Sequence, residues 1–139
     1  MNVREVMTSN PRSLSPDDSI QIAARIMKEE DTGVVPVVDN GRPVGVVTDR
    51  DIVIRAIAED GSCDKPVREI ATLDLVFATP DMSTKEATRI MGEREVRMLP
   101  VVENDRLVGI VSLGDIAVKE GKDSRTGDTL ENISEGVKH

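Results

Sequence analysis

Two short stretches of the chain repeat each other and thereby decide its fold. Residues 45–52 read Gly-Val-Val-Thr-Asp-Arg-Asp-Ile, and residues 109–116 read Gly-Ile-Val-Ser-Leu-Gly-Asp-Ile. The second stretch begins 64 positions after the first, at residue 109 instead of 45. The same offset, with no gap, relates further pairs of segments: 3–5 and 67–69, 25–27 and 89–91, 36–38 and 100–102. The chain therefore contains an internal duplication whose copies share loop lengths as well as elements.

Each copy reads as a βαββα unit. A short extended segment comes first, at residues 13–14 and 76–78, followed by a helix that we expect to begin at Ser15-Pro16 and at Thr79-Pro80, where a hydroxyl cap precedes a proline. Two apolar runs separated by turn formers then predict a hairpin: 34–38 and 44–47 in the first copy, 98–102 and 108–111 in the second. A last helix is predicted to begin at Thr48 and at Ser112.

Finer features of these elements give two further expectations. A proline stands inside the first strand of each hairpin, where it removes a ladder donor, so that strand must lie at a sheet edge or at a bulge. Spacings of three and four residues predict the buried faces of the first helices: Ile20, Ala23, Ala24 and Met27 in one copy, Ala87, Ile90 and Met91 in the other.

The duplication predicts an α+β fold of two βαββα repeats. A unit of this size is marginal by itself and leaves one sheet face uncovered, so we expect the repeats to pack sheet to sheet about a pseudo-twofold axis. The predicted organisation is repeat 1 at residues 1–58, a linker at 59–66, repeat 2 at 67–121, and a polar tail at 122–139.

Composition excludes some classes of function. Of the 139 residues 38% are hydrophobic, but Phe77 is the only aromatic one, so the core must be aliphatic. A net charge of −8 argues against binding to a nucleic-acid backbone. The longest apolar runs are strand-sized, which predicts no membrane span and a cytoplasmic protein. The single cysteine, Cys63, stands among turn formers and is interpreted as an incidental loop thiol.

The pattern resembles the CBS domain, named after cystathionine β-synthase, in its tandem arrangement, the Bateman module. The resemblance rests on Val6-Met7-Thr8, on the two Pro-Val-Val strands, and on a Gly-x-x-Thr/Ser-x-x-Asp signature that occurs twice at the same offset. The resemblance covers nearly all of the chain up to about Gly121. The chain is similar to the stand-alone bacterial and archaeal members of the family.

The Thr-x-x-Asp motif has two physical interpretations. Thr48 with Asp51, and Ser112 with Asp115, stand where a strand gives way to a helix, whose free N–H groups and partial positive charge attract phosphate. A carboxylate at this spacing can accept hydrogen bonds from both hydroxyls of a ribose. The same spacing is close to a capping box, which only closes the helix, and the spacing alone leaves both interpretations open.

The resemblance implies two ligand sites, each completed by the other copy. Site one would join Val46, Thr48, Arg50 and Asp51 to Thr72 and Phe77. Site two would join Ile110, Ser112 and Asp115 to Thr8 and Ser13. The aliphatic residues expected to wall the base, which would be adenine, are Val34, Val37, Met98 and Val101.

The two predicted sites differ in charge. Asp49 adds a carboxylate where phosphates would lie at site one, with Arg50 as partial compensation, whereas Leu113 and Gly114 are uncharged. Arg97 precedes its strand in a position from which it can reach phosphates, and Gly33 is its counterpart in the first copy. We therefore predict that site two binds better.

The predicted function is regulatory: a module that binds AMP, ADP or ATP in the cleft between the repeats and transmits the bound state to a downstream protein that the sequence does not identify. The alternatives are a ligand-free dimerisation or interaction module, and a module for another adenosyl ligand such as NADH or S-adenosylmethionine. No enzyme is expected, because the chain has one histidine, His139, one cysteine, and no phosphate-loop or metal-ligand motif. The resemblance also implies a homodimer and no required cofactor.

Overall fold

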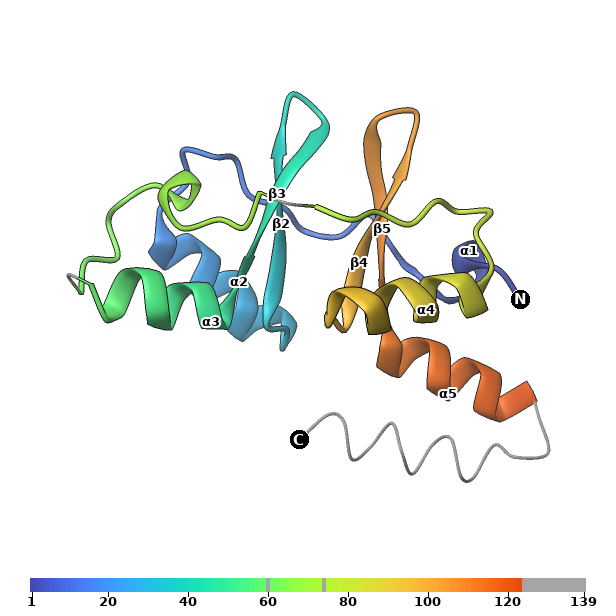
Figure 1. The fold of residues 1–139 in the computed structure, drawn as a ribbon. Coiled ribbons are helices and arrows are strands. Elements are labelled where there is room, and N and C mark those ends of the chain that lie inside the picture. Colours follow the sequence, from blue (N-terminus) through green and yellow to red (C-terminus); the bar gives the residue numbers. More distant parts are fainter. Residues whose placement is uncertain (60, 74, 124–139) are drawn as a thin grey trace. The chain divides into compact units, whose positions relative to one another are not determined.

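The computed structural model describes residues 1–59, 61–73 and 75–123, and the chain divides into two compact units (Figure 1). The repeat-one unit contains Arg12–Leu75 together with Asp105–Leu107. The repeat-two unit contains Met1–Pro11, Val76–Asn104 and, within the described residues, the chain from Val108 to Asp123. We describe each unit by itself. The predicted packing of one sheet on the other stays a prediction.

The repeat-one unit is a hairpin with helices at the end of its strands opposite the turn (Figure 1). Helix α2 (Ile20–Glu30) leads into strands β2 (Val34–Asp39) and β3 (Arg42–Thr48), which pair antiparallel. Helix α3 (Asp49–Asp51) follows β3 at once and continues as the wider π-helical turn η1 (Ile52–Ile57). The short 3-10 helix η2 (Val67–Glu69) closes the unit.

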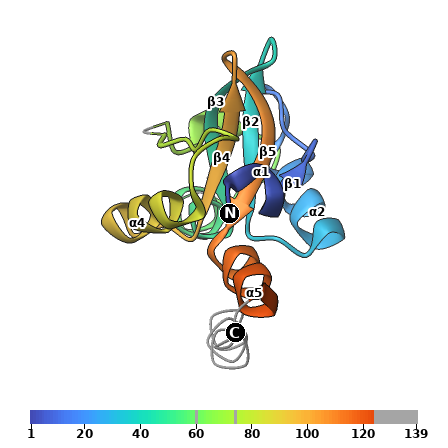
Figure 2. The ribbon, with the colours of Figure 1, turned by 90° about the vertical axis from the view of Figure 1, so that its right-hand side faces the viewer.

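The repeat-two unit has the same succession of elements. Helix α4 (Thr84–Arg94), strands β4 (Met98–Glu103) and β5 (Arg106–Ser112), and helix α5 (Leu113–Asp123) correspond to α2, β2, β3 and the α3–η1 helix. Helix α1 (Val3–Val6) and strand β1 (Thr8–Ser9) lie beside this hairpin, and the sheet order is β1-β5-β4 (Figure 2). The predicted α+β fold, built from two repeats, is confirmed.

The hairpin predictions are confirmed in detail. Asn40 and Gly41 turn the first hairpin with φ of 53° and 84°, and Asn104 and Asp105 turn the second with φ of 54° and 63°. Two successive positive φ values give the turn whose twist matches that of the strands. Pro36 stands beside a bulge between Val37 and Val38, at an edge of β2 where Val37 forms a single-residue bridge with Leu14.

The prediction for the start of the first helix was wrong in both copies. Helices α2 and α4 begin at Ile20 and Thr84, capped by the hydroxyls of Ser19 and Ser83. The predicted starts are turns instead, with Asp18 N–H donating to the Ser15 carbonyl at 3.0 Å and Met82 N–H to the Thr79 carbonyl at 3.1 Å. A hydroxyl followed by a proline suits the first position of a turn as well as a helix cap, so the local signal was ambiguous.

Each copy's leading segment packs in the unit of the other copy. Val3 N–H donates to the Met82 carbonyl at 2.8 Å, and Thr8 pairs with Ile110. In the repeat-one unit, Val67 N–H donates to the Asp18 carbonyl at 2.8 Å. The compact units therefore do not follow the repeat boundaries at residues 1–58 and 67–121, because the segments that begin the repeats are exchanged.

Each unit has its own aliphatic core. In the repeat-one unit the core contains Leu14, Ile20, Val35, Val47 and Val67, among others. In the repeat-two unit it contains Val3, Met91, Leu99, Val101 and Val111, among others. On α2 the residue that completes the buried face is Ile26; the prediction of a buried Ala24 was wrong, since Ala24 is exposed.

Three further observations concern an ion pair on the surface, membrane-spanning helices and the predicted tail. On α4, Arg89 donates a hydrogen bond of 2.9 Å to Glu86, which holds the pKa of Glu86 below its ordinary value. No helix within residues 1–59, 61–73 and 75–123 is both long enough and apolar enough to cross a membrane. The predicted tail lies outside the described residues from position 124 on, as does His139.

Candidate ligand-binding site

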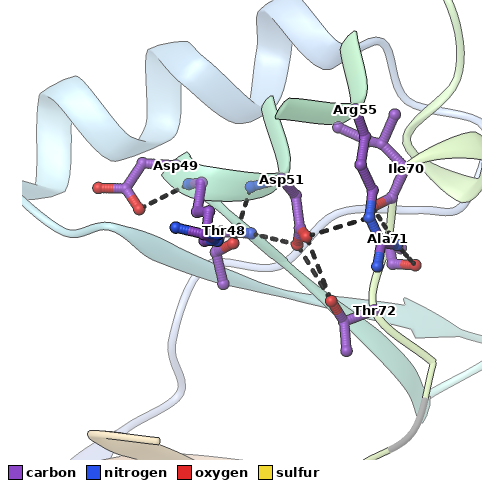
Figure 3. Close-up of polar contacts among 8 residues, drawn as sticks. Thr48, Asp49, Asp51, Arg55, Ile70, Ala71 and Thr72 are labelled. Carbon is purple, nitrogen blue, oxygen red and sulfur yellow. Dashed lines mark hydrogen bonds and ion pairs between the residues drawn. The ribbon is translucent and has the colours of Figure 1, made fainter. Parts of the chain in front are cut away.

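The motif of the repeat-one unit forms a complete capping box (Figure 3). β3 ends at Thr48, whose side-chain Oγ1 accepts a hydrogen bond of 3.0 Å from the Asp51 N–H. In return the Asp51 carboxylate accepts a hydrogen bond of 3.0 Å from the Thr48 N–H. Two N–H groups that the first helical turn would leave unpaired are therefore satisfied by the motif itself.

Asp51 has two further partners besides Thr48. The Thr72 hydroxyl donates to its Oδ1 at 3.3 Å and to its Oδ2 at 3.2 Å, and Arg55 Nε lies 3.7 Å from its Oδ1 (Figure 3). The residue is only 7% exposed. The carboxylate is therefore buried under the hydroxyl of one neighbour and the guanidinium of another.

Residues 70–72 lie beside the motif; their backbone contacts Arg55, and they include Thr72. Arg55 Nη1 donates to the Ile70 carbonyl at 3.3 Å and to the Ala71 carbonyl at 3.4 Å. The backbone of Thr72 pairs with Val46 of β3 through hydrogen bonds of 3.0 and 2.8 Å. The spacing of four residues between Asp51 and Arg55 is a signal that sequence reasoning missed.

The motif of the repeat-two unit is open. The Ser112 Oγ accepts a hydrogen bond of 3.0 Å from the Asp115 N–H, so the hydroxyl half of the cap is present. Asp115 is exposed, and its carboxylate forms no hydrogen bond or ion pair with any residue that the structure describes. Thr8 and Lys119, which correspond to Thr72 and Arg55, are both exposed. Within the described residues this carboxylate is therefore unoccupied, unlike that of Asp51.

The positions of Gly33 and Arg97 match as the repeat requires. Asp49 N–H donates to the Gly33 carbonyl at 2.9 Å, and Leu113 N–H donates to the Arg97 carbonyl at 2.8 Å. The Asp49 carboxylate lies directly over Gly33, because a Cβ added to that glycine would meet Asp49 Oδ2 at 2.9 Å. The first copy thus has a carboxylate beside its helix start, where the second copy has the exposed Arg97.

The remaining predicted site residues are divided between the units. Val46, Thr48, Arg50, Asp51 and Thr72 all belong to the repeat-one unit, and Thr8, Arg97, Ile110, Ser112 and Asp115 to the repeat-two unit. Ser13 and Phe77 each belong to the unit opposite the site for which they were predicted. Of the residues predicted to wall the base, Val37 and Val101 are buried in the cores, while Val34 and Met98 are half-buried.

Residues 1–59, 61–73 and 75–123 contain no group of three or more His, Cys, Asp or Glu side chains placed to hold a metal ion. The chemistry of the two motifs is that of carboxylate, hydroxyl and helix N–H groups, which suits a ligand with hydroxyl and phosphate groups.

A protein-family model described as the CBS domain matches the chain twice, over residues 3–57 and 67–119. The chain therefore belongs to the CBS domain family, and it carries two of these domains in tandem, as the resemblance predicted. The CBS domain-containing protein YhcV of Bacillus subtilis (strain 168) is 40% identical over 133 residues, which cover 96% of this chain and 95% of YhcV.

Two other relatives bear on ligand binding and on catalysis. The solved structure of the CBS domain pair of protein MJ0100, in complex with 5′-methylthioadenosine and S-adenosyl-L-methionine, has a TM-score of 0.80 at 28% identity and covers 89% of this chain and 98% of that one. An inosine-5′-monophosphate dehydrogenase of Korarchaeum cryptofilum (strain OPF8) is 35% identical over 136 residues, which are 97% of this chain but 26% of the dehydrogenase. The similarity thus reaches only a part of that enzyme.

Proposed function

We propose that the chain is a non-catalytic regulatory module of the cytoplasm that binds an adenine nucleotide, AMP, ADP or ATP, at the motif of the repeat-two unit. The observation that carries the proposal is the exposed carboxylate of Asp115, in the first turn of the eleven-residue helix α5, which has no partner among the described residues. Such a carboxylate can accept hydrogen bonds from both ribose hydroxyls, while the start of the helix and Arg97 favour phosphate.

The family supports an adenosyl ligand without choosing among its kinds. The CBS domain pair of MJ0100 binds two compounds that both contain adenosine, the part of the ligand that a motif carboxylate would hold. NADH and S-adenosylmethionine share this part with AMP and ATP. The bound state would be transmitted by a shift of population, because a ligand favours whichever arrangement of the chain binds it better.

Replacing Asp115 with alanine is expected to weaken binding at least tenfold, about 1.4 kcal/mol, because both ribose hydroxyls lose their acceptor. Thermal-shift assays of the unaltered chain with AMP, ADP, ATP, NADH and S-adenosylmethionine first identify the ligand. At a concentration of 100 times Kd that ligand should add about 2.7 kcal/mol of stability. Calorimetry then compares the Asp115→Ala chain with an Asp64→Ala control, whose carboxylate is an exposed loop group. Equal affinities in the two variants would contradict the assignment of Asp115.

A second candidate function, an interaction module that pairs with another copy of the chain, rests on an apolar surface. Val53, Ile54 and Ile57 of η1 are 55%, 50% and 49% exposed. Aliphatic side chains so close together on one turn lose free energy in water and gain it when a partner covers them. The resemblance to stand-alone members of the family implies a homodimer, and we propose one that buries this turn, whether or not a ligand is bound.

An Ile54→Glu chain is therefore expected to sediment as a monomer at concentrations where the unaltered chain is a dimer. Burying an unpaired carboxylate in an apolar interface costs several kcal/mol, and each loss of about 1.4 kcal/mol weakens association tenfold. Val44→Glu is the matched control, since Val44 is also exposed but lies on β3. Dimers of both variants, or a monomeric unaltered chain, would exclude this surface as the interface.

A further inference from the structure

We infer that Arg55 and Thr72 close the repeat-one motif to adenosyl ligands, so that the chain holds one such ligand, in its repeat-two unit. Arg55 is then the residue that distinguishes the two copies of the motif, and Thr72 completes the closure in the first copy. The inference rests on the proposed function, which supplies the ligand class, and concerns the choice between the two motifs.

Both oxygens of the Asp51 carboxylate already have partners. Asp51 Oδ2 accepts from the Thr48 N–H at 3.0 Å and faces the Thr72 hydroxyl at 3.2 Å, while Oδ1 faces that hydroxyl at 3.3 Å and Arg55 Nε at 3.7 Å. A ribose diol needs both oxygens of a carboxylate. Because Asp51 is buried, a ribose can reach them only by displacing Thr72 or Arg55.

Arg55 and Thr72 are both held in place by contacts with the backbone. Arg55 is anchored by two backbone carbonyls, those of Ile70 and Ala71, at 3.3 and 3.4 Å. Thr72 is fixed by its backbone pairing with Val46. Moving either residue breaks contacts that residues 70–72 make with the α3–η1 helix or with β3, so ligand entry would carry a conformational cost.

The corresponding residues of the repeat-two motif do not contact its carboxylate. The repeat-two motif has Lys119 in place of Arg55, and Lys119 forms no ion pair with Asp115. Thr8 holds the place of Thr72 and pairs with β5 in the same way, yet its hydroxyl does not bond to Asp115. The arginine and its carbonyl contacts therefore distinguish the closed motif from the open one.

The probe must lack a phosphate because of Asp49. Its carboxylate would repel the phosphate of AMP at the repeat-one motif whether or not Arg55 is present. 5′-Methylthioadenosine has the ribose diol and no phosphate, so it reports on the carboxylate alone. Any gain of binding by this probe can be attributed to release of Asp51.

The experiment is calorimetric titration of the full chain and its variants with 5′-methylthioadenosine. We expect one equivalent for the unaltered chain and two for the Arg55→Ala and Thr72→Ala chains. Lys119→Ala, the matched control in the open copy, should remain at one equivalent. An Asp115→Ala chain should lose binding of the probe at least tenfold, and adding Arg55→Ala to it should restore one equivalent. Thermal unfolding of each variant establishes that it is folded.

The outcomes separate this inference from the proposed function. Two equivalents for the unaltered chain, or one equivalent for both folded variants of the closing residues, would overturn the inference and leave the proposed function in place. Binding by Arg55→Ala where the unaltered chain binds nothing would support the closure and overturn the assignment of Asp115. No binding by any chain would overturn both.

Discussion

A Val3→Asp chain is expected to lose the folded structure of its repeat-two unit. Val3 is fully buried in the core of that unit, where it packs with residues that follow it by more than seventy positions, such as Ala78 and Leu99. Removing its apolar side chain costs about 1.5–3 kcal/mol, and leaving an unpaired carboxylate in the core costs several kcal/mol more. The total is comparable with the whole stability of a small domain, about 5–15 kcal/mol.

Hydrogen exchange of the backbone amides, read along β4 and β5, measures this loss directly. Arg4→Ala is the matched control on the same short helix, because Arg4 is exposed and its ion pairs with Asp81 and Glu103 lie at the surface. Such pairs contribute about 0–1 kcal/mol. Full protection of β4 and β5 in the Val3→Asp chain would show that the leading segment does not belong to this core.

The second large effect is expected from Asp51→Ala, which should lower the free energy of unfolding by about 2–4 kcal/mol. Removal of the carboxylate ends the capping box, worth about 1 kcal/mol, and a hydrogen bond from Thr72 to a charged group, worth about 1.5–3 kcal/mol. The ion pair with Arg55 adds little, because the Arg55 side chain is 53% exposed. The partly buried Thr48 N–H is also left without its acceptor.

Asp115→Ala is the control for this effect, since it removes the corresponding carboxylate of the other motif. That group is exposed and has no partner among the described residues, so the loss should stay below about 1 kcal/mol. Urea denaturation of the two variants gives both values. Equal losses would mean that Asp51 is no more engaged in solution than Asp115, which would also remove the basis for a closed repeat-one motif.

Features with local causes were predictable from the sequence. The hairpin at Asn40-Gly41 needs positive φ at two successive residues, which these types tolerate, and the last helices begin directly after Thr48 and Ser112 because the hydroxyl of each caps the first turn. The start of the first helix was not predictable in the same way. Ser15 with Pro16 fits a turn and a helix cap equally well, and only the next serine, Ser19, makes the cap.

The sequence by itself determined the duplication, the βαββα order of each copy and the family, because these depend on spacing and on residue type at fixed positions. The residue pattern left open which unit each leading segment joins, because Val3 and Val67 both begin a Val-Arg-Glu stretch, and only the family resemblance implied an exchange. The tertiary structure places Val3 in the core of the repeat-two unit and Val67 in the core of the repeat-one unit. It also decided the state of the two motifs. Asp51 and Asp115 follow their hydroxyls at the same spacing, but only Asp51 lies beneath Thr72 and Arg55, and burial by distant residues cannot be read from a local pattern.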